Sequence, residues 1–245
     1  MNSECGIIIT IDGPAGSGKS TLARGLAHEL GLVYLNTGAT YRALALKAVN
    51  LGIDLDNESE TASLAHKTDI AFKTSGPDKE NQCVFLDGQD VTDAIGKNEI
   101  SIAASRISRH TLVREAMVEL QRRIAEEECA RGNEEHSSEK KISGVVAEGR
   151  DTGTVVFPDA NVKLFLIASP DERARRRIHD FTDNEANLEK ARAEISKRDL
   201  MDTTRDASPL KPAPDAIFID NTGWEREETL AHALEIIRKK IPSLN

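Results

Sequence analysis

The chain has 245 residues, 39% hydrophobic and 30% charged, which is the composition of an ordinary globular protein with a sizeable core. Its formal net charge of -9 at pH 7 argues against non-specific binding to nucleic acid. No apolar run approaches the roughly 20 residues that span a bilayer, and the N-terminus lacks the positive region of a signal peptide. We therefore expect a cytoplasmic protein whose partners are neither nucleic acids nor membranes.

A β-branched apolar run near the N-terminus precedes a phosphate-binding motif. Residues 7–11 predict a strand that is buried on both faces of a parallel sheet. The next residues fit the pattern G-x-x-x-x-G-K-[ST] at every position. They are Gly13, Pro14, Ala15, Gly16, Ser17, Gly18, Lys19 and Ser20. Apolar residues then recur at helical spacing as far as Gly31, so the motif has its required strand and helix, and we predict a nucleotide site completed by Thr21.

The residue types of this loop suit a bound triphosphate and its metal ion. Glycines let the backbone curl so that successive N–H groups point at phosphate oxygens. Lys19 brings a positive charge to the β- and γ-phosphates, and the Ser20 hydroxyl can ligate Mg²⁺, so we predict ATP and Mg²⁺ as cofactors. Glu148 is the candidate carboxylate for holding waters on the metal, with Asp12 as the alternative. An ion pair between Glu148 and an arginine is the competing interpretation.

Strands and helices alternate along the rest of the chain. Further strands are predicted at residues 32–35, 144–147, 162–167 and 216–219. Helices are predicted from about residue 39, over 100–120, from 170 onward and over 224–241. This alternation indicates an α/β fold with a doubly wound parallel sheet. Residues 66–95 differ, because their alternating pattern and turn signals predict a small antiparallel sheet inserted into the core.

Ligands of such folds lie beyond the carboxyl ends of the strands, so polar residues there are candidate site residues. Thr37, Tyr41 and Arg42 follow the second predicted strand, and Arg150 and Asp151 follow the strand at 144–147. Basic residues recur at Arg173, Arg175, Arg176, Arg177, Arg198 and Arg205. Three other arginines fit solvated helix faces or surface ion pairs better, namely Arg122, Arg123 and Arg192.

The many arginines favour an acceptor that is itself a phosphate. A hydroxyl acceptor usually needs a carboxylate to take its proton, whereas a phosphate oxygen is already anionic. The difficulty is then to bring two highly charged groups together, and arginines both screen them and stabilise charge on the transferred phosphoryl group. We therefore predict a kinase acting on a nucleoside monophosphate.

Several segments of the sequence, spread over nearly the full length of the chain, resemble those of bacterial cytidylate kinases. They are residues 11–20, 37–42, 103–105, 113–115 and 148–160, and then Arg198-Asp199 with Asp202 and Arg205. The phosphate loop is widely shared, but the Gly-Arg-Asp-x-Gly-Thr-x-Val-Phe-Pro phrase and the inserted sheet are far more specific. The resemblance implies transfer of the γ-phosphoryl group of ATP to CMP or dCMP, giving ADP and CDP or dCDP, by in-line displacement.

The resemblance also implies roles for individual residues. Ser105, Arg114 and Asp151 would surround the cytosine, whose amino group suits the Asp151 carboxylate. The acceptor phosphate would contact Arg42, Arg150 and Arg205, while Arg198 and Asp202 would lie near the sugar. Arg173, Arg176 and Arg177 would belong to a lid that closes over ATP. The expected catalytic residues are Lys19, Arg150, Arg198 and Arg205, and Thr37 and Tyr41 complete the expected substrate site.

These inferences divide the chain into a core, an insert and a lid. The core comprises residues 1–65, 96–172 and 207–245, the insert is a monophosphate-binding β domain at 66–95, and the lid spans 173–206. A kinase of the same fold acting on another monophosphate or on a metabolite hydroxyl is the nearest alternative. A nucleotide-gated switch is another, although the guanine-reading pattern N-K-x-D is absent. No long amphipathic seam indicates an obligate dimer, so we expect a monomer.

Overall fold

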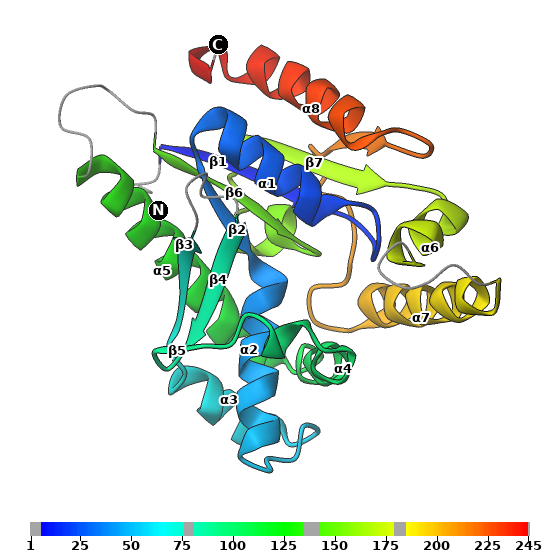
Figure 1. The fold of residues 1–245 in the computed structure, drawn as a ribbon. Helices are drawn as coiled ribbons and strands as arrows, with labels where there is room; N and C mark the ends of the chain where they lie inside the picture. The colour runs from blue at the N-terminus through cyan, green and yellow to red at the C-terminus, as the bar shows by residue number, and fades with distance from the viewer. Residues whose placement is uncertain (1–5, 76–80, 135–142, 179–184, 245) are drawn as a thin grey trace.

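The fold is built on a five-stranded parallel sheet with strand order β2-β6-β1-β7-β8. The computed structural model describes residues 6–75, 81–134, 143–178 and 185–244. The strands are β1 (Ile7–Asp12), β2 (Val33–Asn36), β6 (Gly144–Gly149), β7 (Val162–Ile167) and β8 (Ile217–Asp220). They lie side by side across the middle of the molecule (Figure 1). This arrangement confirms the doubly wound α/β fold predicted from the sequence.

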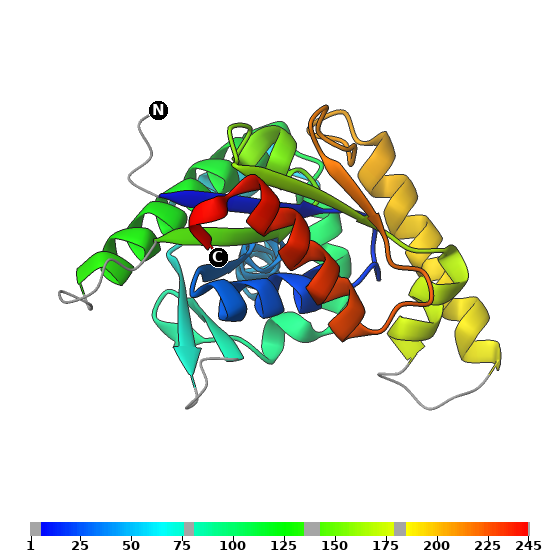
Figure 2. The same cartoon turned by 90° about the horizontal axis from the view of Figure 1, so that it is seen from above.

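Helices cover both faces of the sheet because side chains of the buried strands point alternately to each side. Val146 of β6 packs with α1 (Lys19–Leu30) and α8 (Arg226–Lys240) in one apolar cluster. Val145 and Ala147 pack on the other face, in a cluster that includes α2 (Thr37–Asn50), α3 (Glu58–His66), α4 (Asn98–Ile107) and α5 (Thr111–Glu134). Seen from above, α8 lies across the sheet with α1 beside it (Figure 2).

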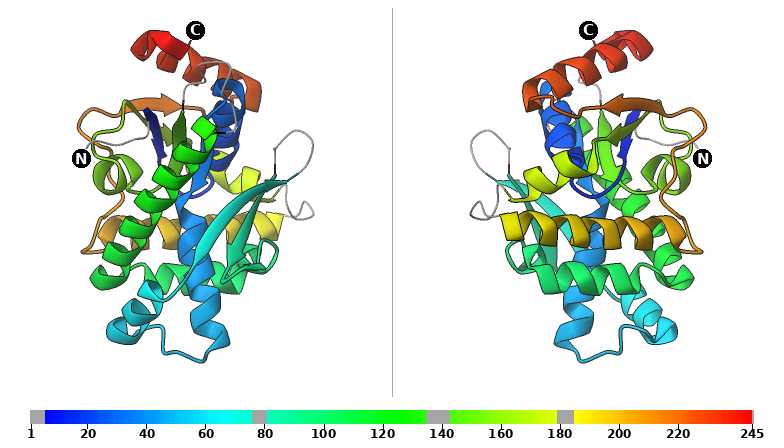
Figure 3. Two further views of the ribbon diagram at one scale, coloured as in Figure 1. Left: turned by 90° about the vertical axis from the view of Figure 1, so that its left-hand side faces the viewer. Right: turned by 90° about the vertical axis from the view of Figure 1, so that its right-hand side faces the viewer.

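A second, antiparallel sheet lies at the edge of the core. It consists of β3 (Ile70–Ser75), β4 (Asn81–Leu86) and β5 (Gln89–Asp90), in that order. The Gln82 side chain donates a 2.6 Å hydrogen bond to the carbonyl oxygen of Tyr34, which joins this sheet to edge strand β2. Figure 3 shows the small sheet beside the main one. The antiparallel sheet predicted within residues 66–95 is therefore confirmed, while the turn at 76–78 falls outside the described residues.

The helical pattern predicted over residues 100–120 belongs to two helices rather than one. Helix α4 ends at Ile107 and α5 begins at Thr111. Between them, the Ser108 carbonyl accepts a 3.1 Å hydrogen bond from the Arg114 guanidinium, and a ring nitrogen of His110 lies 2.9 Å from the Leu55 carbonyl oxygen. Periodicity alone could not reveal this break because apolar residues on both sides of it face the same core.

Two helices pack together beside the carboxyl ends of the strands, as Figures 1 and 3 show. They are α6 (Pro170–Ile178) and α7 (Glu185–Thr204), and Ala174, Ala191 and Ile195 form a small core between them. Short helical turns complete the described chain: η1 (Ala94–Gly96), η2 (Thr152–Val156, a π-helical turn) and η3 (Pro242–Leu244). No described helix combines the length and the apolar character needed to cross a bilayer.

Candidate active site

The phosphate loop runs from the end of β1 to the start of α1, and the backbone conformation at each end of it requires glycine. Gly13 has φ 151°, and a Cβ there would collide with the Leu166 carbonyl oxygen on β7. Gly18 is the N-cap of α1 with φ 93°, in the left-handed region. The loop can therefore pass close to β7 and still present the N-terminus of α1 to a ligand.

Lys19 is buried at the start of α1, and its ammonium group turns back into the loop. Its Nζ donates a 2.7 Å hydrogen bond to the Pro14 carbonyl oxygen. Burial and, to a smaller extent, the positive charge of Arg150 lower the pKa of Lys19 to about 7, against the raising effects of Glu148, Asp202 and Asp12. Burial is therefore the main reason that the charged form of this ammonium is disfavoured here, and a bound triphosphate would favour the charged form.

Ser20 and Glu148 meet because the sheet places β6 next to β1. The Ser20 hydroxyl donates a 2.7 Å hydrogen bond to Oε1 of Glu148, and the Tyr34 hydroxyl donates to the same oxygen at 3.2 Å. Asp12 is engaged differently. Its Oδ1 accepts hydrogen bonds from the backbone N–H and the hydroxyl of Thr152, both at 2.8 Å, and its Oδ2 accepts one from the N–H of Gly153 at 2.7 Å.

Arg42 and Arg198 lie in this region without protein partners. Among the described residues, neither guanidinium takes part in a hydrogen bond or an ion pair. Burial, and after it the charges of Arg150, Arg177 and Arg42, lower the pKa of Arg198 to about 10. Burial also lowers the pKa of Arg42, to which Arg150 contributes as a nearby like charge. Arg42 of α2, Arg150 after β6 and Arg198 of α7 therefore form a cationic cluster, which a bound anion would stabilise.

Asp202 on α7 lies between this cationic cluster and a second group of charged residues around Asp151. It accepts a 2.7 Å hydrogen bond from Nε of Arg150, and its other oxygen lies 3.7 Å from Arg205 Nη1. Burial raises the pKa of Asp202, but Arg150, Arg205 and Arg198 together outweigh that effect and the net shift is downward. The same pairing raises the pKa of Arg150 against the lowering effect of its burial.

A second buried group surrounds Asp151, which follows β6. Arg114 of α5 pairs with Asp151 Oδ2, and Arg205 Nη2 lies 4.0 Å from Asp151 Oδ1. The Arg114 guanidinium also lies over the Tyr41 ring, 5.4 Å from its centroid. Arg114 Nε and Arg205 Nη2 are buried donors without hydrogen-bond partners. Unsatisfied buried donors are costly, so a bound group that offered acceptors here would stabilise them.

Three further predicted substrate residues are Ser105, Thr37 and Tyr41, and the first two donate to backbone carbonyl oxygens. Ser105 donates from its hydroxyl to the Ser101 carbonyl oxygen at 3.1 Å, within its own helix α4. The Thr37 hydroxyl donates to the Glu148 carbonyl oxygen at 2.8 Å, at the N-terminus of α2. Tyr41 is buried, and burial raises its pKa to about 12. The Thr37 hydrogen bond thus joins the N-terminus of α2 to the end of β6. This contact helps to hold Arg42, which lies further along α2, near the cationic cluster.

The predicted lid arginines lie on α6, and two of them contact the phosphate loop. Arg173 Nη1 donates a 3.0 Å hydrogen bond to the Ala15 carbonyl oxygen, and Arg176 Nη1 donates a 3.2 Å bond to that of Ser17. Arg177 reaches Glu194 of α7 at 3.7 Å. Arg173 and Arg176 therefore each donate a hydrogen bond to the backbone of the phosphate loop.

Two residues of the site were not singled out by sequence reasoning. Asn221 follows β8, and its side chain donates to the Ser17 carbonyl oxygen at 3.2 Å and accepts from Arg176 at 3.1 Å. Its position at the carboxyl end of a strand was the available signal. Tyr34 lies within β2, and nothing in the sequence pattern indicated its bond to Glu148.

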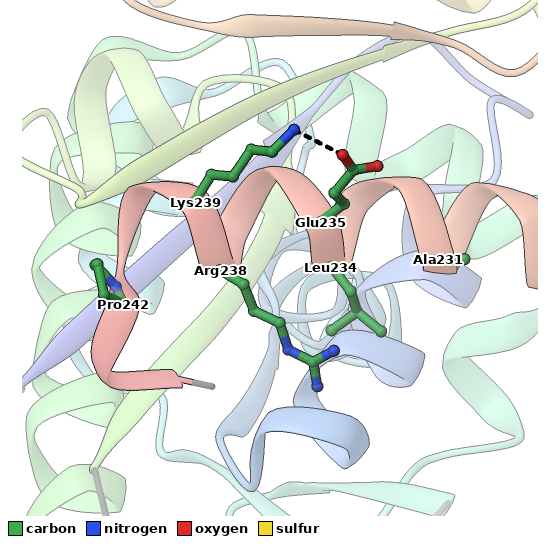
Figure 4. Close-up of a pocket in the computed structure, with 6 residues that line it drawn as sticks. All are labelled: Ala231, Leu234, Glu235, Arg238, Lys239 and Pro242. Carbon is green, nitrogen blue, oxygen red and sulfur yellow. Dashed lines mark hydrogen bonds and ion pairs between the residues drawn. The ribbon is translucent and has the colours of Figure 1, made fainter.

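A hollow on the surface lies elsewhere, along the C-terminal half of α8 (Figure 4). Its lining residues are Ala231, Leu234, Glu235, Arg238, Lys239 and Pro242. The Lys239 ammonium lies 2.6 Å from Glu235, so these charges pair with each other along the helix. None of these residues belongs to the phosphate loop, to α2 or to α7.

A phosphate loop after the central strand of a parallel sheet, facing an arginine cluster, defines a P-loop kinase fold of the nucleotide-binding class. The family model for cytidylate kinase matches residues 9–239. The chain is 43% identical over 237 residues to a cytidylate kinase of Geobacillus thermodenitrificans, covering 96% of this chain and 98% of the relative. The chain belongs to the cytidylate kinase family.

Other relatives show the same extent of similarity. A cytidylate kinase of Pelotomaculum thermopropionicum is 48% identical over 224 residues, covering 91% of this chain and 92% of the relative. One from Shewanella baltica is 41% identical over 245 residues, covering 99% and 100%. Among solved structures, a shikimate kinase from Bacteroides thetaiotaomicron aligns at 12% identity with a TM-score of 0.38, over 95% of this chain and 98% of that one. That score is too low to support any argument.

Proposed function

We propose that this chain transfers the γ-phosphoryl group of ATP to CMP or dCMP, giving ADP and CDP or dCDP, with an arginine cluster as the electrostatic clamp. Membership of the cytidylate kinase family supports the reaction. The observation that carries the clamp is the position of Arg42 and Arg198, which are cationic, partly buried and without partners among the described residues. Partly buried cations without partners are costly, and a bound anion would supply the missing negative charge.

The donor triphosphate would bind at residues 13–21, with Lys19 moving from the Pro14 carbonyl oxygen to the β- and γ-phosphates. Mg²⁺ would supply a positive charge between the phosphates. Ser20 and Glu148 fit such an ion, because a hydroxyl can ligate it and a carboxylate 2.7 Å away can hold its waters. No group of three or more His, Cys, Asp or Glu side chains among the described residues could hold a metal, which suits an ion bound largely by substrate phosphates. Because both Asp12 oxygens accept bonds from Thr152 and Gly153, we favour Glu148 over Asp12.

The acceptor monophosphate would lie between Arg42, Arg150, Arg198 and Arg205. Its 5′-phosphate oxygen is already anionic and attacks the γ-phosphorus in line, so no side chain needs to remove a proton. The arginines would instead screen the repulsion between acceptor and donor and stabilise charge on the group in transfer. Asp202, paired with Arg150, would face the sugar while holding one clamp arginine in position.

Cytosine would be recognised beside Asp151. The carboxylate can accept from the N4 amino group, and the unpartnered donors of Arg114 and Arg205 can serve the ring acceptors. Uracil would present an acceptor where cytosine has its amino group, and the unfavourable contact with Asp151 should discriminate strongly. Ser105 remains part of this proposed pocket, although its hydroxyl would first have to leave the Ser101 carbonyl oxygen.

We further propose the division of the chain into a core, a monophosphate-binding insert at residues 66–95 and a lid at 173–206. Helices α6 and α7 occupy most of the proposed lid, and β3–β5 occupy the insert. Arg173, Arg176 and Arg177 would act from the lid on the donor side, the first two through the backbone of the phosphate loop. We also propose that the protein acts as a monomer in the cytoplasm.

A coupled assay of ADP release, with CMP, dCMP, UMP and AMP as acceptors, tests this function. We expect turnover with CMP and dCMP, much slower turnover with UMP, and essentially none with AMP. Omitting Mg²⁺ should abolish the activity. Equal turnover with AMP and CMP would contradict recognition of cytosine, and full activity after removal of Mg²⁺ would contradict the proposed metal site.

A further inference from the structure

Asp199 of α7 forms a closed set of contacts with α6 and the phosphate loop. Its Oδ1 accepts a 3.0 Å hydrogen bond from the N–H of Ala15, and its Oδ2 pairs with Arg173 Nη1. The same Nη1 donates a 3.0 Å bond to the Ala15 carbonyl oxygen. One residue of the loop thus has both its backbone N–H and its C=O bonded to a single ion pair, which comes from two different helices.

This ion pair differs from ordinary surface pairs by its burial and its anchoring. The side chains of Arg173 and Asp199 are 9% and 20% exposed. Arg173 Nε is also bonded, to the Ala168 carbonyl oxygen at 3.2 Å beyond the end of β7. Because the pair carries no net charge, the Asp199 carboxylate can lie beside the phosphate loop with little repulsion of a bound triphosphate.

The helix that carries Asp199 also carries residues of the proposed acceptor site. Arg198 precedes Asp199 directly, and Asp202 follows three residues later, about one helical turn along α7. Fixing Asp199 on Ala15 therefore fixes the distance between the phosphate loop and the groups that hold the acceptor. Phosphoryl transfer depends on this distance, because the attacking and leaving oxygens must be in line with the transferred group.

We propose that Asp199 is a positioning residue, which acts with Arg173 to hold the acceptor-binding helix α7 in register with the phosphate loop. This inference rests on the proposed donor and acceptor sites and adds a link between them. Asp199 touches neither substrate in this proposal and acts through Ala15. The link should make the binding of ATP and CMP cooperative, because each ligand orders an element that the other one needs.

The test compares Asp199→Asn with Asp171→Asn. The first variant keeps an acceptor for the Ala15 N–H but leaves the Arg173 charge without its partner. The second removes the same charge from an ion pair that joins the same two helices, Asp171 with Arg192 at 2.9 Å, where both side chains are exposed and no loop residue is involved. Each variant should be assayed for kcat and for KM with CMP and with ATP, and its melting temperature should be measured.

We expect Asp199→Asn to lower kcat about 10- to 100-fold, because misalignment of reacting groups by about 1 Å has effects of that size. With the other substrate saturating, each KM should rise by no more than the factor by which coupling is lost, since the binding groups remain present. In calorimetric titrations, a non-hydrolysable ATP analogue with Mg²⁺ should tighten CMP binding to the wild-type protein and to Asp171→Asn, but not to Asp199→Asn. Arg173→Lys, which keeps a charge beside Asp199, should retain more of this coupling than Arg173→Gln.

The outcomes separate this inference from the proposed function. Wild-type kcat in a folded Asp199→Asn protein would overturn the positioning role, and so would unchanged coupling or an equal effect of Asp171→Asn. If Asp199→Asn melts below the assay temperature, the coupling in Arg173→Lys and Arg173→Gln decides, and equal coupling in those two overturns it. The proposed function would fail separately, if the wild-type protein did not phosphorylate CMP.

Discussion

The arginines around the phosphate loop form two groups with opposite surroundings, an outer group on α6 and an inner group near Arg150. In the outer group, Arg173 and Arg176 of α6 direct their donors to backbone carbonyl oxygens of the loop, and each also has a carboxylate partner. In the inner group, Arg42 and Arg198 have no partner among the described residues, and burial lowers the pKa of both. The first pair is satisfied by the protein itself, whereas we propose that the second binds a ligand.

This difference teaches how one residue type can serve both structure and binding. A guanidinium offers five donors in a rigid planar fork, so it can join backbone carbonyl oxygens that no other side chain would reach together. The same fork without partners is an unfavourable concentration of charge, which a phosphate relieves. If the inner arginines bind substrate as proposed, substitutions in the two groups should have separable effects on stability and on binding.

The largest expected effect belongs to Lys19 of the phosphate loop. Lys19→Met should lower kcat about 10²- to 10³-fold, because it removes a preorganised positive charge from the group in transfer. Folding should be retained, since a buried cation with a lowered pKa contributes little to stability. Steady-state kinetics with CMP measure the effect. A loss confined to the KM for ATP would mean that Lys19 serves binding only.

Removing an inner arginine should impair activity without lowering stability. Arg198→Ala or Arg42→Ala should each reduce kcat/KM for CMP by about 1.5–3 kcal/mol, the range for a lost charge-assisted contact, or roughly 10- to 100-fold. The melting temperature of the free protein should stay the same or rise, because an unpaired buried charge has been removed. Arg123→Ala is a suitable control, since this exposed arginine pairs only weakly, with Glu127 at 3.9 Å. Unchanged kinetics in both inner variants would remove them from the site.

Removing an outer arginine should instead lower stability more than it lowers activity. Arg176→Ala leaves the Asn221 carbonyl oxygen without its 2.8 Å bond and the Ser17 carbonyl oxygen without one of its two donors. Each oxygen keeps one other donor, the Trp224 N–H at 3.1 Å for Asn221 and the Asn221 side chain at 3.2 Å for Ser17. Unfolding in urea should show a loss of stability of about 1.5–3 kcal/mol, the range for lost hydrogen bonds to a charged group. A variant with full stability and a large loss of CMP binding would reverse the comparison.

The smallest expected effect is a pH dependence that comes from Lys19. Its pKa of about 7 in the folded protein lies below its ordinary value of 10.5, so the unfolded chain binds more protons between these two values. The contribution of Lys19 to stability should therefore rise with pH across this window, and Lys19→Met should lack that slope.

Binding of ATP should restore the proton to Lys19. At pH 8 we expect uptake of a fraction of one proton on binding, because the triphosphate raises the pKa of the ammonium. Calorimetric titrations in buffers of different ionisation enthalpy measure this uptake. Equal proton uptake by the wild-type protein and Lys19→Met would assign it to another group.

The sequence by itself determined the parts of the protein that depend on neighbouring residues. The phosphate loop is a local structure, because the run before it can only be buried as a strand and its glycines adopt backbone angles that other residues avoid. Gly31 ends α1 in the left-handed conformation, as its position indicated. The turn signals around the small sheet likewise predicted β3, β4 and β5.

Only the tertiary structure decided which distant residues meet. Sequence reasoning left Glu148 and Asp12 as alternatives, and the strand order resolved their contacts by inserting β6 between β1 and β2. Glu148 then lies against Ser20, while Asp12 binds the start of η2. In the same way, no pattern distinguished the outer from the inner arginines. Packing of α6 and α7 onto the loop gave one group its backbone partners and left the other group unpaired, because side-chain contacts depend on position in space and not on spacing along the chain.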